Sequence, residues 1–490
     1  MSQPPASSPP HTAGPSATPA AAADDGAGTA VLPATARKLL RRLAVEQAGA
    51  RAPALLAGVM RDGRLVWSAT RGQLSGSPAG GELSAGDTQS RIGSITKTFT
   101  SVLIARLRDD GRLDFADPLE RHVAGTPFGD RTIAQLLSHT AGVQAESDGL
   151  WWERTPGAGW SQLAATFDQG TVRHRGGRSY HYSNLGYAIL GEVVARHRGC
   201  SWWDALRSEV LEPLEMLRTT YLPAGPQLSG FAVHPWADVV LPEPAHDSGA
   251  MAPAGQLWST VADLARWAAF AAGDTGDVLD PDTLAELLEP QGSEPGSESP
   301  SGYGLGWRIA QDSGRTLVGH SGSMPGFLAG TYADIDEGVG AVALANTTSG
   351  VATFGLCQDL IAIMAEEEPR LPTAWTPVAL PDELLELVGP WHWGPAAFVV
   401  RATSPDQLLL VALADGGRGS RFSPNADGSW TGHDGYFAGE TLRVGRDSDG
   451  TVSHLDLATF VFTREPYDPA AAVPGGVDPR GWGGTTTEKT

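Results

Sequence analysis

The feature that most constrains this chain is a serine, followed three residues later by a lysine, at the start of an apolar helical run. Ser94 and Lys97 precede apolar side chains that recur at helical spacing over residues 102–107, and Gly111 lies at the expected end. A small polar residue at the start and a glycine at the end predict a helix that begins at or near Ser94. Residues three apart on a helix are neighbours, so the Lys97 amine can reach the Ser94 hydroxyl.

Lysine is scarce in this chain, so a lysine at position 97 favours proton-transfer chemistry there. Of 35 basic residues only three are lysines, Lys38, Lys97 and Lys489. Arginine keeps its proton in proteins, whereas a partly buried lysine can lose it. Free N–H groups at a helix start also favour a developing negative charge. The segment therefore holds a candidate nucleophile, base and anion site, against the alternative of an ordinary helix that happens to contain S-x-x-K.

Charge and composition exclude several classes of function. The formal net charge of −21 would be repelled by phosphate backbones and anionic lipids, so we expect no nucleic-acid or membrane partner. Residues 1–31 lack the basic and apolar regions of a signal peptide, and we expect them to be disordered and the protein to be cytoplasmic. The sequence contains no common metal-site or phosphate-loop motif, and we expect no metal and no cofactor.

The order of elements predicts an α+β unit over residues 32–368. A helix at about 34–48 and a strand hairpin around Asp62-Gly63 come first, helices dominate residues 115–290, and strands return over Gly302–Thr347 before a closing helix. Both chain ends then contribute to one antiparallel sheet flanked by helices, and the inserted helices form an all-α lobe.

A second domain follows. Prolines over residues 369–376 indicate a linker, and over 377–466 short apolar runs alternate with Gly, Asp and Asn turns. This pattern predicts a small antiparallel β-barrel. We expect the tail, residues 467–490, to be disordered.

Two later segments carry polar residues that can complete a site with Ser94. Tyr182-Ser183-Asn184 precedes a helical run, where Asn184 is expected to be the N-cap. The same segment offers a phenol for proton transfer and an amide to hold a substrate. Gly319–Ser323 follows an expected strand over residues 316–318, and its small residues can let a substrate lie against the strand edge. Each segment alone also has a structural explanation, as a capped helix start or a glycine-rich bend.

Together, in this order, the three segments resemble the serine β-lactamase and penicillin-binding protein superfamily, nearest its class C β-lactamase, D,D-carboxypeptidase and esterase branch. The resemblance covers about residues 33–366 and includes Leu136–Gly142, Tyr303–Trp307 and Ala343–Asn346. It implies a β-lactamase/transpeptidase-like fold and cofactor-free acylation of a serine. The barrel that follows is similar to the lipocalin-like domain of penicillin-binding-protein-type thioesterases.

The resemblance also implies roles for single residues. Ser94 would be the acylated nucleophile, and Lys97 and Tyr182 would share the proton transfers. Asn184 would hold the substrate amide. The backbone N–H groups of Ser94 and Ser323 would form the oxyanion hole.

The third motif departs from the family pattern. His320 and Ser321 replace the usual Lys-Thr before Gly322, and the resemblance makes these residues part of the catalytic and substrate-binding site. Neutral histidine holds a carboxylate less firmly than lysine, which argues against efficient β-lactam hydrolysis. Asn346 is expected to contact a substrate carboxylate.

Three further aromatic residues are Trp151, Trp152 and His139. Trp151 and Trp152 lie in a Gly/Pro-rich loop, where they belong either to the core or to a hydrophobic wall of the substrate cleft. His139 is expected to be a structural hydrogen bonder, because its helix already has a cap at Thr132.

The leading prediction is a serine hydrolase or acyltransferase that acts through acyl-Ser94 on amide or ester bonds of D-residue peptides or related small acyl substrates. A carrier protein can present such a peptide. An alternative is a nonribosomal peptide macrocyclase, because water and an amine compete for one acyl-enzyme. A different class remains open as well, namely a slowly acylating receptor or a scaffold that binds partners through its barrel.

Overall fold

The computed structural model describes residues 31–72, 84–293, 301–414, 416–468 and 473–474. The chain divides into two compact units, with Leu371 the last residue of the first and Pro372 the first of the second. The disorder predicted for residues 1–31 and 467–490 falls almost entirely outside the described residues. Within the described part of the chain, no helix is long and apolar enough to cross a membrane.

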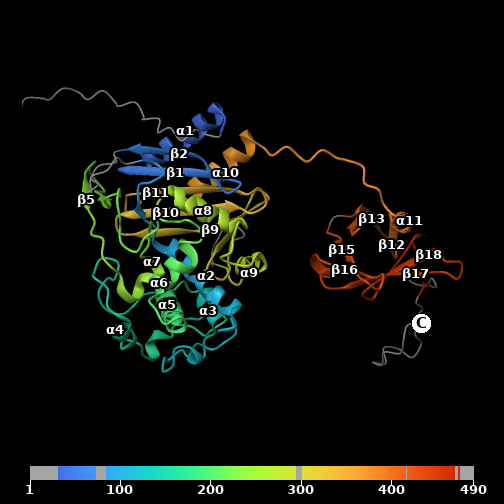
Figure 1. Cartoon of the computed structure of the whole chain (residues 1–490), viewed down its shortest axis with the longest axis horizontal. Helices are drawn as coiled ribbons and strands as arrows, with labels where there is room; N and C mark the ends of the chain where they lie inside the picture. The colour runs from blue at the N-terminus through green and yellow to red at the C-terminus, as the bar shows by residue number, and fades with distance from the viewer. Residues whose placement is uncertain (1–30, 73–83, 294–300, 415, 469–472, 475–490) are drawn as a thin grey trace, which may run out of the picture. The chain divides into compact units, whose positions relative to one another are not determined.

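The first unit is built on a seven-stranded antiparallel sheet in the order β2-β1-β11-β10-β9-β8-β7 (Figure 1). Strand β1, from the start of the unit, pairs with β11 from its end, so both chain ends build one sheet, as the order of elements predicted. The strands are β1 (Ala54–Arg61), β2 (Arg64–Gly72), β7 (Ser301–Tyr303), β8 (Arg308–Asp312), β9 (Arg315–Met324), β10 (Phe327–Asp334) and β11 (Val339–Ala345).

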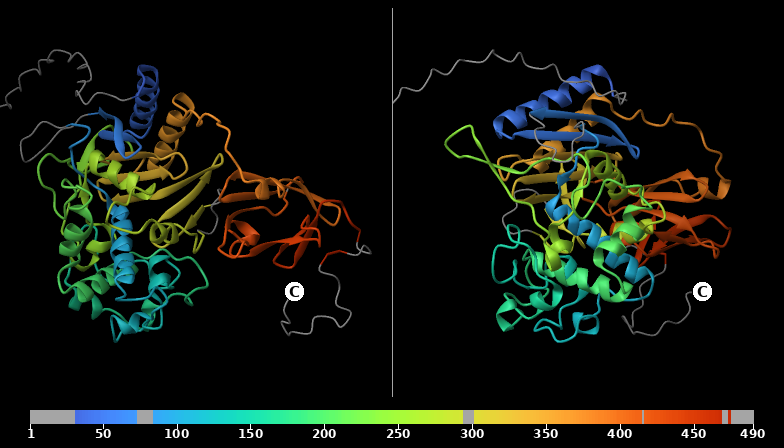
Figure 2. Two further views of the ribbon diagram at one scale, coloured as in Figure 1. Left: turned by 45° about the vertical axis from the view of Figure 1, so that its right-hand side comes forward. Right: turned by 60° about the vertical axis from the view of Figure 1, so that its left-hand side comes forward.

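Helices cover both faces of this sheet. Helices α1 (Pro33–Gly49) and α10 (Thr353–Glu367) pack together on one face, and Figure 2 shows them in blue and orange. Helices α2 (Thr96–Asp109) and α8 (Val261–Ala271) belong to the core on the other face. Strand β11 is buried at every position, which explains its uninterrupted apolar sequence, because a strand covered on both faces needs no polar alternation.

The segments between the two halves of the sheet form a second, mainly helical lobe around α5, which is buried over most of its length. Its helices are α3 (Ile133–Leu137), α4 (Trp160–Ala164), α5 (Asn184–Arg198), α6 (Trp202–Leu206), α7 (Ala252–Gly255) and α9 (Pro281–Leu287). Two short strand pairs complete the unit: β3 (Ser90–Arg91) with β6 (Trp258–Ser259), and β4 (Phe231–Val233) with β5 (Val240–Pro242). The predicted α+β architecture with an all-α lobe is confirmed.

Two local predictions were wrong. Gly319–Ser323 lies inside β9 rather than beyond the end of a strand, because β10 pairs with β9 as far as Phe327 opposite Met324. The N-cap of α5 is Ser183, whose Oγ accepts the backbone N–H of Gly186 at 2.9 Å, so Asn184 is already helical. The boundary of β9 is decided by its pairing with β10, and that of α5 by a cap one residue earlier than expected.

The second unit contains a closed eight-stranded antiparallel barrel, preceded by α11 (Asp382–Leu385), which confirms the barrel prediction. Inward side chains fill it with its own hydrophobic core, which includes Trp391, Phe422 and Leu457. The strands are β12 (Gly389–Trp393), β13 (Ala396–Ser404), β14 (Gln407–Ala412), β15 (Ser420–Pro424), β16 (Trp430–Gly432), β17 (Thr441–Arg446), β18 (Val452–Leu457) and β19 (Phe460–Thr463).

Candidate active site

Ser94 lies in a 3₁₀ turn, η1 (Gly93–Ile95), that leads directly into α2. The turn approaches β9 closely because both sides carry glycine. A Cβ atom on Gly93 would lie 2.6 Å from the backbone N of Ser323, and one on Gly322 would lie 1.9 Å from the backbone O of Ile92. Gly93 also has a φ of +52°, which glycine adopts without strain. The backbone of Ser94 therefore sits directly against the Gly322–Ser323 segment.

Lys97 is completely buried beside Ser94. Its Nζ atom lies 2.9 Å from Ser94 Oγ and donates to the backbone O of Ala254 at 2.7 Å. Burial lowers the pKa of the Lys97 amine to about 7, although the carboxylate of Glu146 acts to raise it. A lysine with this pKa is substantially neutral near pH 7 and can accept the hydroxyl proton of Ser94.

Tyr182 is the third group of this cluster. Its side chain is hydrogen-bonded to Ser94, and burial raises the pKa of the phenol above its usual value, so the phenol keeps its proton. The His139 ring lies 4.1 Å from the Tyr182 ring, centroid to centroid, and His139 Nδ1 accepts the backbone N–H of Ser183 at 3.0 Å. His139 is therefore a structural hydrogen bonder, as predicted, and it holds the segment that carries Tyr182.

Glu146 ties two predicted site residues together. Its Oε1 atom accepts from Asn184 Nδ2, and its Oε2 atom accepts from Trp152 Nε1, each at 2.7 Å. The two adjacent tryptophans have different positions. Trp152 is buried, whereas Trp151 is 56% exposed and donates its Nε1–H to Glu153. Trp152 therefore packs in the core and Trp151 lies at the surface, and the contribution of either residue to a substrate cleft stays a prediction.

His320 is buried on β9 and faces Tyr303. Its Nδ1 lies 2.5 Å from the backbone O of Ser321 and its Nε2 lies 3.1 Å from the Tyr303 hydroxyl. Because a carbonyl only accepts, Nδ1 carries the proton and Nε2 accepts from the phenol. Burial and the charge of Arg308 hold the pKa of His320 well below its usual range, so the ring is neutral. The hydroxyl groups of Ser321 and Tyr332 lie 2.9 Å apart.

Arg308 brings a positive charge to this cluster. It is the first residue of β8 and pairs with Gly319 of β9, so β9 continues past the start of β8 through His320–Met324. Burial by itself would lower the pKa of Arg308, but the nearby tyrosines, Tyr332 first among them, raise it overall, and the guanidinium is charged. Its charge in turn acts to lower the pKa of Lys97.

Asn346 is engaged within the fold. Its Oδ1 accepts the backbone N–H of Ala54 at 2.6 Å and its Nδ2 donates to the backbone O of Ser229 at 3.1 Å. The side chain is 1% exposed and locks the end of β11 to its neighbours. The predicted contact with a substrate carboxylate therefore finds no support in the structure.

Glu146 and Arg308 also lie in this cluster and were not predicted from the sequence. Arg308 carried a usable signal, because it directly follows Tyr303–Trp307 and is a lone charge at the start of a strand. Glu146 carried none, because its partners come from separate segments of the helical lobe.

Comparisons with known proteins place this chain in a family and show its fold. The family model described as Beta-lactamase matches residues 6–366, and the model described as Domain of unknown function (DUF7586) matches residues 380–464. The human protein beta-lactamase-like 1 is 30% identical over 293 residues, which make up 56% of this chain and 57% of the human protein. The chain spans about half the length of several curated relatives that it matches.

Solved structures share the fold. The octameric penicillin-binding protein homologue from Pyrococcus abyssi is 21% identical with a TM-score of 0.60, covering 87% of this chain and 99% of the other. The D-stereospecific amidohydrolase from a Streptomyces species is 24% identical with a TM-score of 0.56, covering 70% of this chain and 100% of the other. Because the Beta-lactamase model spans residues 6–366, well over half of the chain, this protein belongs to the beta-lactamase family.

Proposed function

We propose that this protein is a serine hydrolase or acyltransferase that forms an acyl-enzyme at Ser94 and acts on amide or ester bonds of D-residue peptides or related small acyl donors. The observation that carries this proposal is the 2.9 Å contact between Lys97 Nζ and Ser94 Oγ, with a lysine whose pKa is lowered to about 7 by burial. A neutral amine at this distance can take the hydroxyl proton as the oxygen attacks a carbonyl.

The reaction divides into two steps. In the first, Ser94 Oγ bonds to the carbonyl carbon, its proton passes to Lys97, and Tyr182 delivers a proton to the departing amine or alcohol as the old bond breaks. The backbone N–H groups of Ser94 and Ser323, which the close approach of η1 to β9 brings together, receive the negative oxygen. In the second, water or an amine attacks the ester and gives up a proton to Tyr182, while Lys97 returns its proton to Ser94 Oγ as the acyl bond breaks.

Two features support an extended peptide as the acyl donor. Strand β9 continues past the start of β8 through His320–Met324, and an extended chain can lie along such a strand edge through backbone hydrogen bonds. The Streptomyces structural neighbour is described as a D-stereospecific amidohydrolase, which favours D-residues at the cleaved bond.

Arg308 is the group we assign to a substrate carboxylate. His320 is neutral and already contacts Tyr303 and its own strand, so it offers no charge to an anion. Arg308 is charged and lies at the point where β9 passes β8. A guanidinium can bind a carboxylate through two parallel hydrogen bonds, which suits a peptide with a free C-terminus.

The test uses a matched pair of tripeptides that end in two D-residues, one with a free carboxylate and one with a C-terminal amide. We expect wild-type kcat/KM to favour the free acid, and Arg308→Gln to lower that preference by about tenfold to a hundredfold. Arg315→Gln on β9, whose nearest carboxylates lie 3.9 Å away, is the control and should keep it. Equal preference in wild type and Arg308→Gln would refute the role of Arg308.

Product analysis decides between the remaining functions. A linear acid from a peptide thioester supports hydrolysis, whereas an amide or a cyclic peptide supports the macrocyclase alternative. A stoichiometric Ser94 adduct without turnover of any donor would instead favour the slowly acylating receptor.

A further inference from the structure

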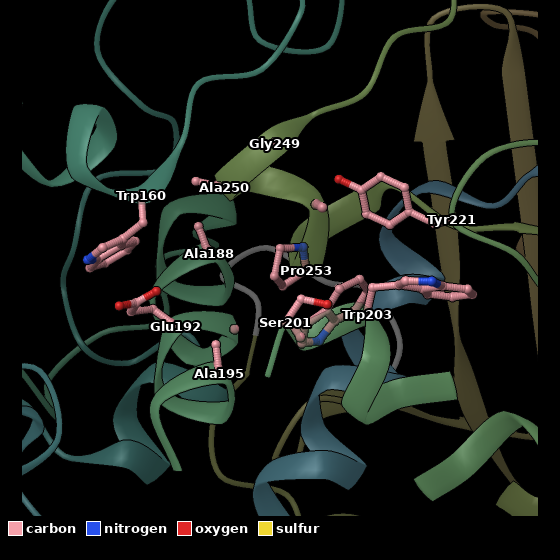
Figure 3. A pocket seen from close by; sticks show the side chains of 13 residues that line it. Trp160, Ala188, Glu192, Ala195, Ser201, Trp203, Tyr221, Gly249, Ala250 and Pro253 are labelled. Atoms are coloured by element: carbon pink, nitrogen blue, oxygen red, sulfur yellow. The ribbon is translucent and has the colours of Figure 1, made fainter. Parts of the chain in front are cut away.

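A cavity of about 360 Å³ lies in the helical lobe, separate from Ser94. Figure 3 shows aromatic side chains at its two ends, Trp160 at one and Trp203 with Tyr221 at the other, with Ala188 and Pro253 between them. Its volume falls within the range of about 300–1,000 Å³ that is common for small-molecule sites. The residues proposed for catalysis do not line it.

Small residues of α5 and α7 line the middle of the cavity. Ala188, Gly191 and Ala195 repeat at helical spacing on α5, and α7 packs against this stripe so closely that a Cβ on Gly191 would lie 2.1 Å from Pro253 Cγ. The large aromatic side chains Trp160, Trp203 and Tyr221 stand on either side of the stripe rather than on it (Figure 3). This arrangement leaves a space with apolar walls between aromatic ends.

Two polar features define which molecule fits. Trp202 lines the cavity and is 6% exposed, and its buried indole N–H has no hydrogen-bond partner among the described residues. Among the lining residues that the structure describes, Glu192 carries the single charge, a carboxylate that also pairs with Arg196 at 2.7 Å. Aromatic walls favour a flat apolar body, and a carboxylate favours a neutral or cationic molecule over an anion.

One wall of the cavity is also a support of the catalytic lysine. Ala252 and Pro253 of α7 line the cavity. The backbone O of Pro253 accepts from Thr100 Oγ1 at 2.9 Å, and that of the next residue, Ala254, accepts from Lys97 at 2.7 Å. A molecule that packs against Pro253 therefore restrains the peptide groups that hold Lys97.

The geometry points to a second binding site for a flat apolar molecule, neutral or cationic, whose occupancy holds α7 against Lys97 and thereby promotes acylation of Ser94. The claim that a molecule binds here depends only on the cavity. The effect on acylation rests on the proposed function, and the two parts are measured separately.

The binding experiment is calorimetric titration of the full-length protein with three molecules that share the indole ring: indole (neutral), gramine (a tertiary amine, cationic) and indole-3-acetate (anionic). Indole and gramine should bind, and the anion should bind at least about tenfold more weakly, a difference of about 1.4 kcal/mol. Glu192→Gln should leave indole binding unchanged and reduce the preference for gramine over indole-3-acetate.

A pair of variants tests the location. Ala195→Phe fills the cavity from α5 and should weaken indole binding at least about tenfold. Ala285→Phe makes the same change at an exposed position of α9 and should bind as wild type does. Equal affinity for all three indoles, or wild-type affinity in Ala195→Phe, would overturn the site.

The coupling is measured as the rate of Ser94 acylation by p-nitrophenyl acetate with and without saturating indole, which has no amine to intercept the acyl group. We expect the rate to rise about fivefold in wild type and to stay constant in Ala195→Phe. An unchanged wild-type rate despite bound indole would refute the link through α7. If Ser94 is not acylated at all, the proposed function fails, and the titrations still decide whether the cavity binds.

Discussion

The surroundings of Lys97 favour the uncharged form of its amine. The side chain is fully buried, its Nζ donates to the carbonyl of Ala254, and the aromatic ring of Tyr182 lies 5.0 Å away. Withdrawal from water favours the uncharged amine, and this outweighs the opposing charges of Glu146 and Glu153 in lowering the pKa of Lys97 to about 7.

The pH dependence of acylation follows from this pKa. Only the neutral amine can accept the Ser94 proton, and the amine is neutral above its pKa, so the acylation rate should rise with pH, with a midpoint at about 7, and then level off. Stopped-flow measurement of the p-nitrophenol burst between about pH 5.5 and 8.5 tests this. A rate that falls or stays constant over that interval would contradict the role of Lys97 as base.

Lys97→Arg separates charge from proton transfer. The guanidinium keeps the positive charge and does not deprotonate, so acylation should fall about 10²- to 10⁴-fold, as expected for loss of a general base. Lys38→Arg makes the same change at an exposed ion pair with Glu367 on α1 and α10, and should leave the rate unchanged. The thermal unfolding midpoint of each variant shows whether the fold survives, and a wild-type rate in a folded Lys97→Arg protein would exclude the assignment.

At the scale of elements, the site depends on how closely η1 approaches β9. Two glycines allow this, since a side chain on Gly93 would meet Ser323 N at 2.6 Å and one on Gly322 would meet Ile92 O at 1.9 Å. Because Gly93 and Gly322 carry no side chains, the turn that holds Ser94 can lie directly against β9.

Gly93→Ala tests this approach. The substitution places a Cβ against backbone and should push η1 off β9, and a displacement of about 1 Å at a reacting group can cost about a hundredfold in rate. Gly111→Ala is the matched control, because Gly111 also has positive φ, +67°, but meets nothing within 4 Å. Both variants should lose about 1 kcal/mol of stability to strain at positive φ, Gly93→Ala should lose more because its Cβ also meets the backbone of Ser323, and only Gly93→Ala should lose acylation. Equal rates in the two variants would show that the close approach is not needed.

The sequence predicted elements better than it predicted their limits. Period and turn residues located α2 and the hairpin of β1 and β2, because these depend on local pattern. The true end of β9 depends on pairing with β10, which no local pattern records.

The difference between local and long-range contacts also explains which site residues could be predicted from the sequence. The proximity of Ser94 and Lys97 is a property of one helical turn and was predictable. The backbone contacts of Asn346 join three distant segments, and the position of Arg308 depends on which strand β8 pairs with. The cavity beside α7 could not be predicted from the sequence, because its walls come from α4 to α7 and the loops between them.

On the scale of the whole molecule, the chain has separate hydrophobic cores in its two units. The barrel core includes Trp391, which is 0% exposed and donates its indole N–H to the backbone O of Leu387 at 2.7 Å. The cores of the first unit contain none of the barrel residues. Each unit has the buried apolar side chains that independent stability requires.

Trp391→Ala tests that independence. Removing the indole from the barrel core should cost about 3–5 kcal/mol there, so calorimetry of the full chain should show one unfolding transition lowered and another unchanged. Acylation of Ser94 should keep its wild-type rate. Trp375→Ala, at an 87% exposed position before the barrel, should shift neither transition. A single transition that moves as a whole would contradict two independently stable units.

The measurement that tests the central claim most directly is intact-mass spectrometry of the full-length protein after exposure to p-nitrophenyl acetate, a β-lactam and a D-residue peptide thioester. The cluster of Ser94, Lys97 and Tyr182 predicts a covalent adduct of one acyl group with at least one donor, and no adduct in Ser94→Ala. An adduct of equal yield in Ser94→Ala, or none with any donor in the wild-type protein, would contradict acylation at Ser94.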